Sequence, residues 1–205
     1  MIDQLNSRQL DVLCELSNIG VGHAATALSQ LLQRPVMLEV PKVSVVDIAE
    51  VPDLLGGPER LVAGVRLQVL GEARGNILLV IPAKSAGRLV SMLGTAGSDE
   101  PLESDLAVST LCEIGNILAS SYLSVLSDMI GAPLIPSIPK FAYDMTGAVI
   151  DDVLVELGTE GDLALLVETV FFSPRHEKSE IRGHFFLLPT AGSLATLLRA
   201  VGEGP

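Results

Sequence analysis

The sequence has no tryptophan, and aromatic residues make up only 3% of its 205 residues. Because single-stranded nucleic acids are commonly held by stacking on aromatic rings, so few rings disfavour an oligonucleotide-binding protein. Positive charge is also scarce: 13 lysines and arginines stand against 25 aspartates and glutamates, which gives a formal net charge of −12. A surface this acidic repels a phosphate backbone. We therefore expect no nucleic-acid partner.

Cysteines and long apolar runs are scarce too. The chain has two cysteines, Cys14 and Cys112, and we expect both to be free, largely buried thiols in a reducing compartment. No uninterrupted apolar run of about 18 residues occurs, so a membrane-spanning helix is not expected. No basic segment followed by an apolar one opens the sequence, so a secretion signal is not expected either. These absences favour a cytoplasmic protein without membrane attachment.

The chain does contain an internal repeat. Glu15-Leu16-Ser17-Asn18-Ile19 is matched 98 positions later (15 to 113) by Glu113-Ile114-Gly115-Asn116-Ile117. The same offset relates Cys14 to Cys112, Pro35 to Pro133, and Pro41-Lys42 to Pro139-Lys140. We expect a single domain over residues 1–205, made of two repeats at about 7–95 and 105–202. An acidic, turn-rich linker at 95–104 joins them.

Hydrophobic periodicity and turn residues predict the secondary structure. Long helices are expected at 7–33, with Ser7 as N-cap, and at about 105–129. Shorter helices are expected at 82–93, around 143–154 and after residue 189, and a loop at 50–61. Strands are expected at 36–40, 43–47, 64–70, 76–81, 133–138, 163–172 and 181–188, with a break at Pro41. The predicted fold is α+β: an internally duplicated, pseudo-two-fold domain whose mixed, largely antiparallel sheet is packed by two long helices and shorter ones.

The repeated acid and amide lie on one helix face, since residues three apart are a turn apart. Each pair belongs to a polar stripe: Asp11, Glu15, Asn18, Gly22, Thr26 and Ser29 in the first half, and Ser109, Glu113, Asn116, Ser120, Ser124 and Ser127 in the second. An exposed carboxylate can pair with a partner's lysine, and a carboxamide can orient a water. The two groups suit hydrolysis of a phosphoryl group whose metal and lysine reside on another protein. The alternative is that both stripes are only the solvated faces of amphipathic helices.

Both copies fit the longer pattern D/S-x3-E-x2-N-x22-P. The first copy has Asp11, Glu15, Asn18 and Pro41, and the second has Ser109, Glu113, Asn116 and Pro139. In this pattern the chain resembles the CheC family of chemotaxis phosphatases, whose relatives include CheX and FliY. The resemblance covers essentially the whole chain.

The resemblance implies hydrolysis of the aspartyl phosphate on the response regulator CheY. Glu15 and Glu113 would contact the active-site lysine of the receiver domain, and Asn18 and Asn116 would orient the attacking water. No cofactor of its own is implied, because Mg²⁺ would be bound by the receiver. Two motifs in one chain, where CheX obtains two by dimerising, imply a monomer.

Asp144 lies in a region that resembles the docking surface for the receptor deamidase CheD, and a helix cap is the alternative for this residue. Two other functions remain open: a non-catalytic module that sequesters phosphorylated CheY or CheD, and a component of the flagellar switch. The histidines, His23, His176 and His184, show no metal-ligand spacing. Gly20-Val21-Gly22 lies inside a predicted helix and lacks a phosphate-loop lysine, so close helix packing is expected there.

Overall fold

The computed structural model describes residues 7–33, 35–93, 101–157, 163–172 and 181–202. Most of the expected acidic linker (94–100) lies outside these ranges, as does His176. In chain order the elements are α1 (Ser7–Leu32), β1 (Met37–Asp47), η2 (Ile48–Glu50), α2 (Val51–Leu54), β2 (Leu61–Gly71), β3 (Gly75–Pro82), α3 (Ala83–Met92), α4 (Asp105–Ile130), β4 (Leu134–Pro136), β5 (Lys140–Met145), α5 (Thr146–Leu157), β6 (Leu163–Phe172), β7 (Ile181–Pro189) and α6 (Ala191–Gly202).

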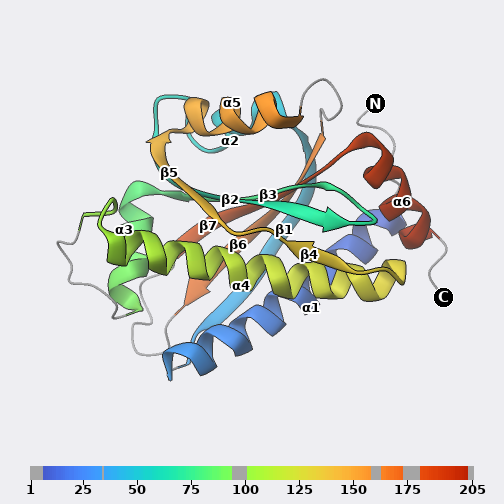
Figure 1. Ribbon diagram of the computed structural model, residues 1–205, viewed down its shortest axis with the longest axis horizontal. Coiled ribbons are helices and arrows are strands. Elements are labelled where there is room, and N and C mark those ends of the chain that lie inside the picture. Colours follow the sequence, from blue (N-terminus) through green and yellow to red (C-terminus); the bar gives the residue numbers. More distant parts are fainter. Residues whose placement is uncertain (1–6, 34, 94–100, 158–162, 173–180, 203–205) are drawn as a thin grey trace.

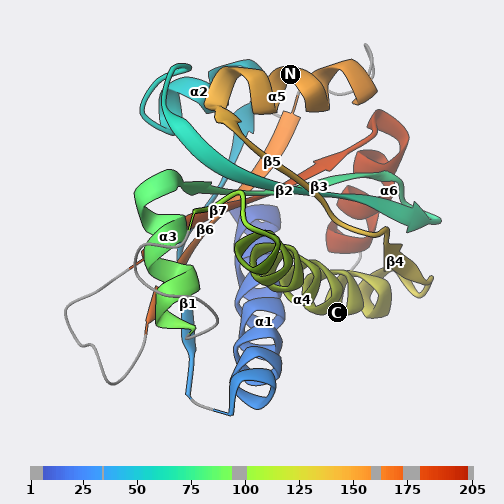
Figure 2. The ribbon, with the colours of Figure 1, turned by 60° about the vertical axis from the view of Figure 1, so that its left-hand side comes forward.

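The elements form three layers, with one sheet between two sets of helices (Figures 1 and 2). The helices α1, α3, α4 and α6 cover one face, and α2 and α5 cover the other. Because side chains alternate along a strand, each face has its own core. Val65, Ile77 and Leu79 contribute to the larger core under α1 and α4. Leu78 and Val80 contribute to the smaller core under α5.

The sheet carries the symmetry of the repeat. Within the described residues its strand order is β1-β6-β7-β3-β2-β4, and β5 also pairs with β2. Every pairing is antiparallel. At the centre Leu78 of β3 pairs with Phe186 of β7, and these residues are 108 positions apart (186 − 78), as are Arg74 and Arg182. A pseudo-two-fold axis therefore passes between β3 and β7, which confirms the expected fold class.

The two long helices are equal in length and lie side by side on the sheet. Each has 26 residues, and both ends of α4 follow those of α1 by 98 positions (7 to 105 and 32 to 130). A Cβ atom at Gly20 would lie 3.1 Å from the Tyr122 Cα, so this glycine lets the helices approach closely. Close packing is thus confirmed for Gly20, whereas Gly22 is exposed with nothing near it.

The expected strand break at Pro41 is wrong. β1 continues through this proline, and the pairing with β6 only shifts register between Glu39 and Lys42. Proline lacks the N–H that a central strand must donate, but β1 is at the edge of the sheet and a bulge absorbs the missing bond.

Two other segments also differ from expectation. The predicted loop at 50–61 contains the four-residue helix α2, because Pro52 suits the first turn of a helix. The predicted helix around 143–154 begins later, at Thr146, because residues 140–145 form the edge strand β5. Register pairing with β2, which only the folded sheet supplies, decides this boundary.

By length and composition alone, α4 is apolar enough to cross a membrane, and it is the one such helix among the described residues. Its most apolar 18-residue window has a mean hydropathy of 1.3, and half of that window is buried inside the protein. The buried side chains, among them Leu111, Leu118 and Tyr122, belong to the core between α4 and the sheet. Packing in this core accounts for the apolar character of α4.

Candidate functional site

The first motif lies on the outer face of α1. Glu15 and Asn18 are exposed, as are Asp11 before them and Thr26 after them. The side-chain amide of Asn18 donates to the carbonyl of Cys14 at 3.1 Å, so the helix itself holds this group. The first acid and amide thus lie at the surface, as expected, with the amide bonded to its own helix.

The second motif lies on the outer face of α4. Glu113 is exposed, and Asn116 is half-buried instead of fully exposed. The next residue along the stripe, Ser120, is also exposed. In Figure 1 α1 and α4 run in opposite directions across the sheet, so the two motifs lie on different parts of the helix pair. The structure therefore contains two separate candidate sites.

A serine near the end of each long helix ties the following chain to the motif stripe. The Ser29 hydroxyl accepts the N–H of Val36 at 2.9 Å, and the Ser127 hydroxyl accepts the N–H of Leu134 at 2.9 Å. Both serines are eleven residues after a motif asparagine, which is about three helical turns. The chain that leaves each helix therefore turns back along the side of the helix that carries the motif.

The residues between the acid and the amide differ in the two copies. Ser17 is fully buried, where its hydroxyl donates to the Leu13 carbonyl at 2.7 Å and lies 3.3 Å from the Tyr122 hydroxyl. At the matching position Gly115 packs on β2, and a Cβ atom there would lie 2.7 Å from Val65. α1 is thus fixed against α4 by a buried polar contact, and α4 against the sheet by close approach.

Each motif glutamate is preceded by a cysteine, and no cluster of metal ligands lies among the described residues. Cys14 and Cys112 are free, as expected, and both are half-buried. Burial raises the pKa of the Cys112 thiol, which keeps it protonated near neutral pH. Among the residues described, no three histidine, cysteine, aspartate or glutamate side chains gather as a metal site. The second motif presents the carboxylate of Glu113 and the carboxamide of Asn116, and the first presents those of Glu15 and Asn18 with the exposed carboxylate of Asp11 one turn earlier.

Asp144 belongs to a different face of the molecule. The sequence predicted that Asp144 is helical, and this is wrong. Asp144 is the next-to-last residue of the strand β5. Its carboxylate accepts the N–H of Met145 at 2.7 Å, just before α5 begins. The strand position follows from pairing with Val62 of β2. The sheet lies between Asp144 and the two motif helices.

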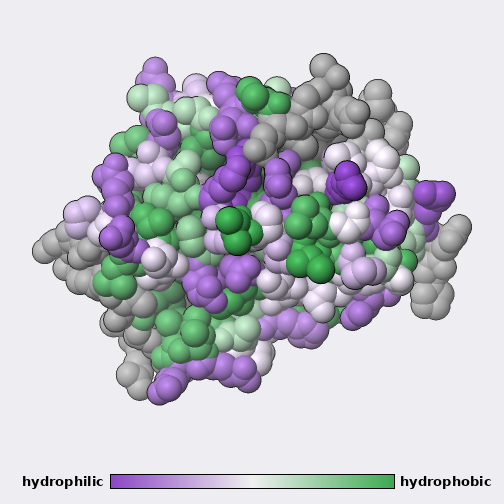
Figure 3. Space-filling model, viewed as in Figure 1, coloured by the Kyte–Doolittle hydropathy of each residue, from purple (hydrophilic) through white to green (hydrophobic). Residues whose placement is uncertain are grey.

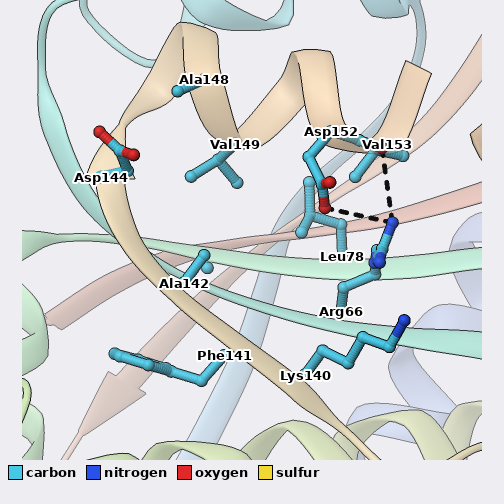
Figure 4. A pocket seen from close by; sticks show the side chains of 11 residues that line it. Arg66, Leu78, Lys140, Phe141, Ala142, Asp144, Ala148, Val149, Asp152 and Val153 are labelled. Atoms are coloured by element: carbon cyan, nitrogen blue, oxygen red, sulfur yellow. Dashed lines mark hydrogen bonds and ion pairs between the residues drawn. The ribbon is translucent and has the colours of Figure 1, made fainter. Parts of the chain in front are cut away.

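A cavity of about 520 Å³ lies beside Asp144, between β5, β2 and α5 (Figure 4). Arg66 is at its floor and donates to Asp152 of α5, with 3.3 Å between Nη1 and the carboxylate and 3.5 Å to the carbonyl. Lys140 also lines the cavity, so its two cations are matched by two carboxylates. The ion pair ties α5 to the sheet.

Sequence reasoning missed one symmetric feature, a pair of polar residues facing each other on adjacent strands in each half. Gln68 faces Asn76 in the first half, and Glu168 faces His184 in the second. Asn76 and His184 are the residues that follow Arg74-Gly75 and Arg182-Gly183, so the sequence offset of 108 is the signal that could have found them. Desolvation lowers the pKa of His184, and the nearby Glu168 carboxylate opposes that shift.

Comparison with known proteins agrees with the geometry. A profile of the CheC-like family matches residues 9–45 and 106–143, which contain both motifs. The CheY-P phosphatase CheC of Bacillus subtilis is 37% identical over 201 residues, which cover 97% of this chain and 96% of that protein. The flagellar motor switch phosphatase FliY of B. subtilis is 26% identical over 174 residues, covering 83% of this chain and 43% of that protein.

A solved structure extends the comparison to the fold. The crystal structure of FliY from Thermotoga maritima superimposes with a TM-score of 0.76 at 20% identity, covering 98% of each chain. The common fold, the two matched motifs and the near-complete alignment lead to one conclusion: the chain belongs to the CheC-like family.

Proposed function

We propose that this chain is a cytoplasmic chemotaxis phosphatase that hydrolyses the aspartyl phosphate of a CheY-like receiver at both motifs. The observation that carries the proposal is 37% identity over 97% of the chain to a protein named CheY-P phosphatase CheC. The exposure of both glutamates supports it, because a group that acts on another protein must be accessible. The receiver is thus the substrate.

In the proposed mechanism, Glu15 and Glu113 bind the receiver. Each carboxylate pairs with the lysine beside the phosphorylated aspartate. Since the chain carries a net charge of −12, its general field does not attract an acidic protein, and the attraction must be local. An ion pair that is desolvated in the complex contributes more than one at an exposed rim. The glutamates therefore provide register as well as affinity.

The asparagines act on the water. The carbonyl oxygen of Asn18 or Asn116 accepts a hydrogen bond from a water placed in line with the phosphoryl group. The water oxygen attacks phosphorus as the phosphorus–oxygen bond to aspartate breaks. The aspartate carboxylate is restored on the receiver, and both protons of the water end on the inorganic phosphate that leaves. The receiver would bring its own Mg²⁺ to screen the charge of the phosphoryl group, and this chain would supply the orientation of the water.

Phosphate release from a phosphorylated receiver tests the proposal. The double variant Asn18→Ala with Asn116→Ala should lower the rate by about tenfold to a thousandfold, the range expected for loss of positioning and proton-transfer groups. The matched control is Thr26→Ala with Ser124→Ala, exposed positions on the same stripes away from the motifs. Full activity in the asparagine double variant would refute the mechanism.

A second function has a specific observation in its favour: one relative is named a flagellar motor switch phosphatase. In that case the chain would bind switch proteins whether or not a receiver is phosphorylated. A pull-down with the receiver, with and without a phosphate mimic such as beryllofluoride, separates the two functions. Binding that ignores the mimic favours the switch component, and phosphate-dependent binding without hydrolysis favours a sequestering module.

The proposal also includes a second partner, CheD. Asp144, exposed at the end of β5, would contribute to a CheD docking surface on the face opposite the motifs. Asp144→Lys should then abolish co-purification with CheD without changing phosphate release.

The protein should be a monomer, because one chain already contains two motifs. Light scattering should give a mass near 21.5 kDa, and twice that mass would contradict it.

A further inference from the structure

A cluster of exposed apolar side chains lies along the outer edge of β4. Ile138, in the segment between β4 and β5, is 83% exposed, Ile135 is 60% exposed and Leu70 is 49% exposed. Leu70 and Ile135 face each other in the pairing of β2 with β4. In Figure 3 hydrophobic groups stand out over this edge among polar neighbours. Ile138 has the largest exposed fraction of these three side chains.

Four contacts place Ile138 beside Asn116. Ser127 of α4 is bonded to Leu134, and Ser137 donates to the Gln68 carbonyl of β2. Phe141 pairs with Val65, against which Gly115 packs. Going back from Ser127 to Asn116 covers about 17 Å of helix. Going on from Leu134 to Ile138 or the next residue covers about 13–17 Å of extended chain. The helix from Ser127 back to Asn116 and the chain from Leu134 on to Ile138 run in the same direction over similar lengths, so Asn116 and Ile138 lie beside each other.

The position that matches Ile138 in the first half is not exposed in this way. The counterpart of Ile138, 98 positions earlier, is Val40, which is half-buried and packs against the larger core. The difference follows from the backbone: β1 continues through Val40 and keeps it against the sheet, whereas residues 137–139 lie outside β4 and β5. The highly exposed Ile138 therefore adjoins the second motif, whereas the exposed apolar side chain beside the first motif is Ile19 of α1 itself, which is 43% exposed.

We propose that Ile138 is a docking contact for the receiver at the second motif, an inference that rests on the proposed function. The occupant is the receiver and not a second copy, because the side chain adjoins the motif that has to meet the receiver. Burial of its apolar surface against the receiver favours binding, which the net charge of −12 does not. Ile138 is thus a specificity-determining residue that acts through binding, while Glu113 and Asn116 act on the lysine and the water.

The experiment isolates each site before testing the contact. In an Asn18→Ala background only the second site works, and in an Asn116→Ala background only the first. Ile138→Ser is introduced into both. The matched control is Val155→Ser, which changes a side chain that is 82% exposed on α5, on the other face of the sheet. Thermal unfolding of every variant checks that the fold is retained.

In the Asn18→Ala background, Ile138→Ser should raise the KM for the phosphorylated receiver about tenfold, as expected when one apolar anchor is lost from an interface, and leave kcat unchanged. In the Asn116→Ala background it should change neither constant. Equal effects of Ile138→Ser and Val155→Ser would overturn the inference and leave the proposed function intact. Absence of phosphate release with the unsubstituted protein would refute the function itself. A doubled mass in light scattering that Ile138→Ser reduces to 21.5 kDa would assign the contact to a second copy and overturn the inference.

Discussion

The two motif copies share their surface and differ in what supports it. Helices of equal length present an exposed glutamate in both halves. Asn18 is bonded to the Cys14 carbonyl, whereas within the described residues the half-buried Asn116 makes no such bond to its own helix. Beneath them, a buried hydroxyl contact in α1 corresponds to close approach to the sheet in α4. Duplication thus retained the groups that face outward, while the packing beneath them diverged. Equal motifs therefore need not be equally active.

The largest effect should come from Tyr122 of α4, which packs against Gly20 and Ser17 of α1. Its counterpart in the first half is the fully buried Ala24 (24 to 122). Its ring is 2% exposed and packs edge-on against Phe185 at 5.3 Å. Tyr122→Ala should lower the free energy of unfolding by about 3–5 kcal/mol, through the cavity that it leaves. Tyr122→Phe should lower it by about 1 kcal/mol, since only the contact with Ser17 is lost. Urea denaturation measures both, and similar losses would mean that the ring does not pin the helices.

The next effect is charge reversal at the glutamates. Under the proposed function, Glu15→Lys with Glu113→Lys should weaken binding of the phosphorylated receiver by about tenfold or more, because a desolvated ion pair becomes a repulsion. Glu72→Lys also replaces an exposed glutamate by lysine, in the turn between β2 and β3. It should weaken binding of the receiver by less than about fivefold. Titration calorimetry compares the variants. Equal losses would show that overall charge governs the interaction.

A smaller effect should separate the two asparagines. The bond from the Asn18 amide nitrogen to the Cys14 carbonyl holds the side chain back along the helix. For its carbonyl oxygen to reach a water above the helix, the side chain has to rotate and break this bond, which costs about 1 kcal/mol, or roughly a fivefold lower rate at the first site. Asn116→Ala should therefore remove most of the phosphate release, and Asn18→Ala should leave most of it. Initial rates of the two single variants test the difference. A greater loss in Asn18→Ala would reverse the assignment.

The smallest effect concerns the polar strand pairs. Because burial lowers the pKa of His184 below its usual value near 6.5, the unfolded chain binds a proton at higher pH than the folded chain does. The free energy of unfolding should thus fall as pH drops below about 6.5. His184→Asn, which places in the second half the amide that the first half has in Asn76, should reduce that fall. Urea midpoints at pH 7 and 5.5 measure it, and an unchanged pH dependence would exclude His184.

Local pattern determined much of this protein. The spacing of apolar residues and the 98-residue offset predicted two long, roughly equivalent helices, which prove equal in length, and the stripes predicted which faces meet solvent. Those predictions succeed because helical periodicity is a property of neighbouring residues. Glu15, Asn18 and Glu113 are exposed for that reason, and Cys14 and Cys112 are free, although half-buried. The motif pattern also carried the family assignment.

Only the tertiary structure decided the remaining features. Pro41 stays within a strand because β1 is at the sheet edge, and Asp144 is in a strand because β5 pairs with β2. The exposure of Ile138 and the pairing of Glu168 with His184 depend on segments that are distant in the sequence. The repeat offset changes from 98 to 108 between the helices and the central strands, so no single offset relates the halves. Burial and pairing are set by contacts between distant residues, and those exist only once the sheet has formed.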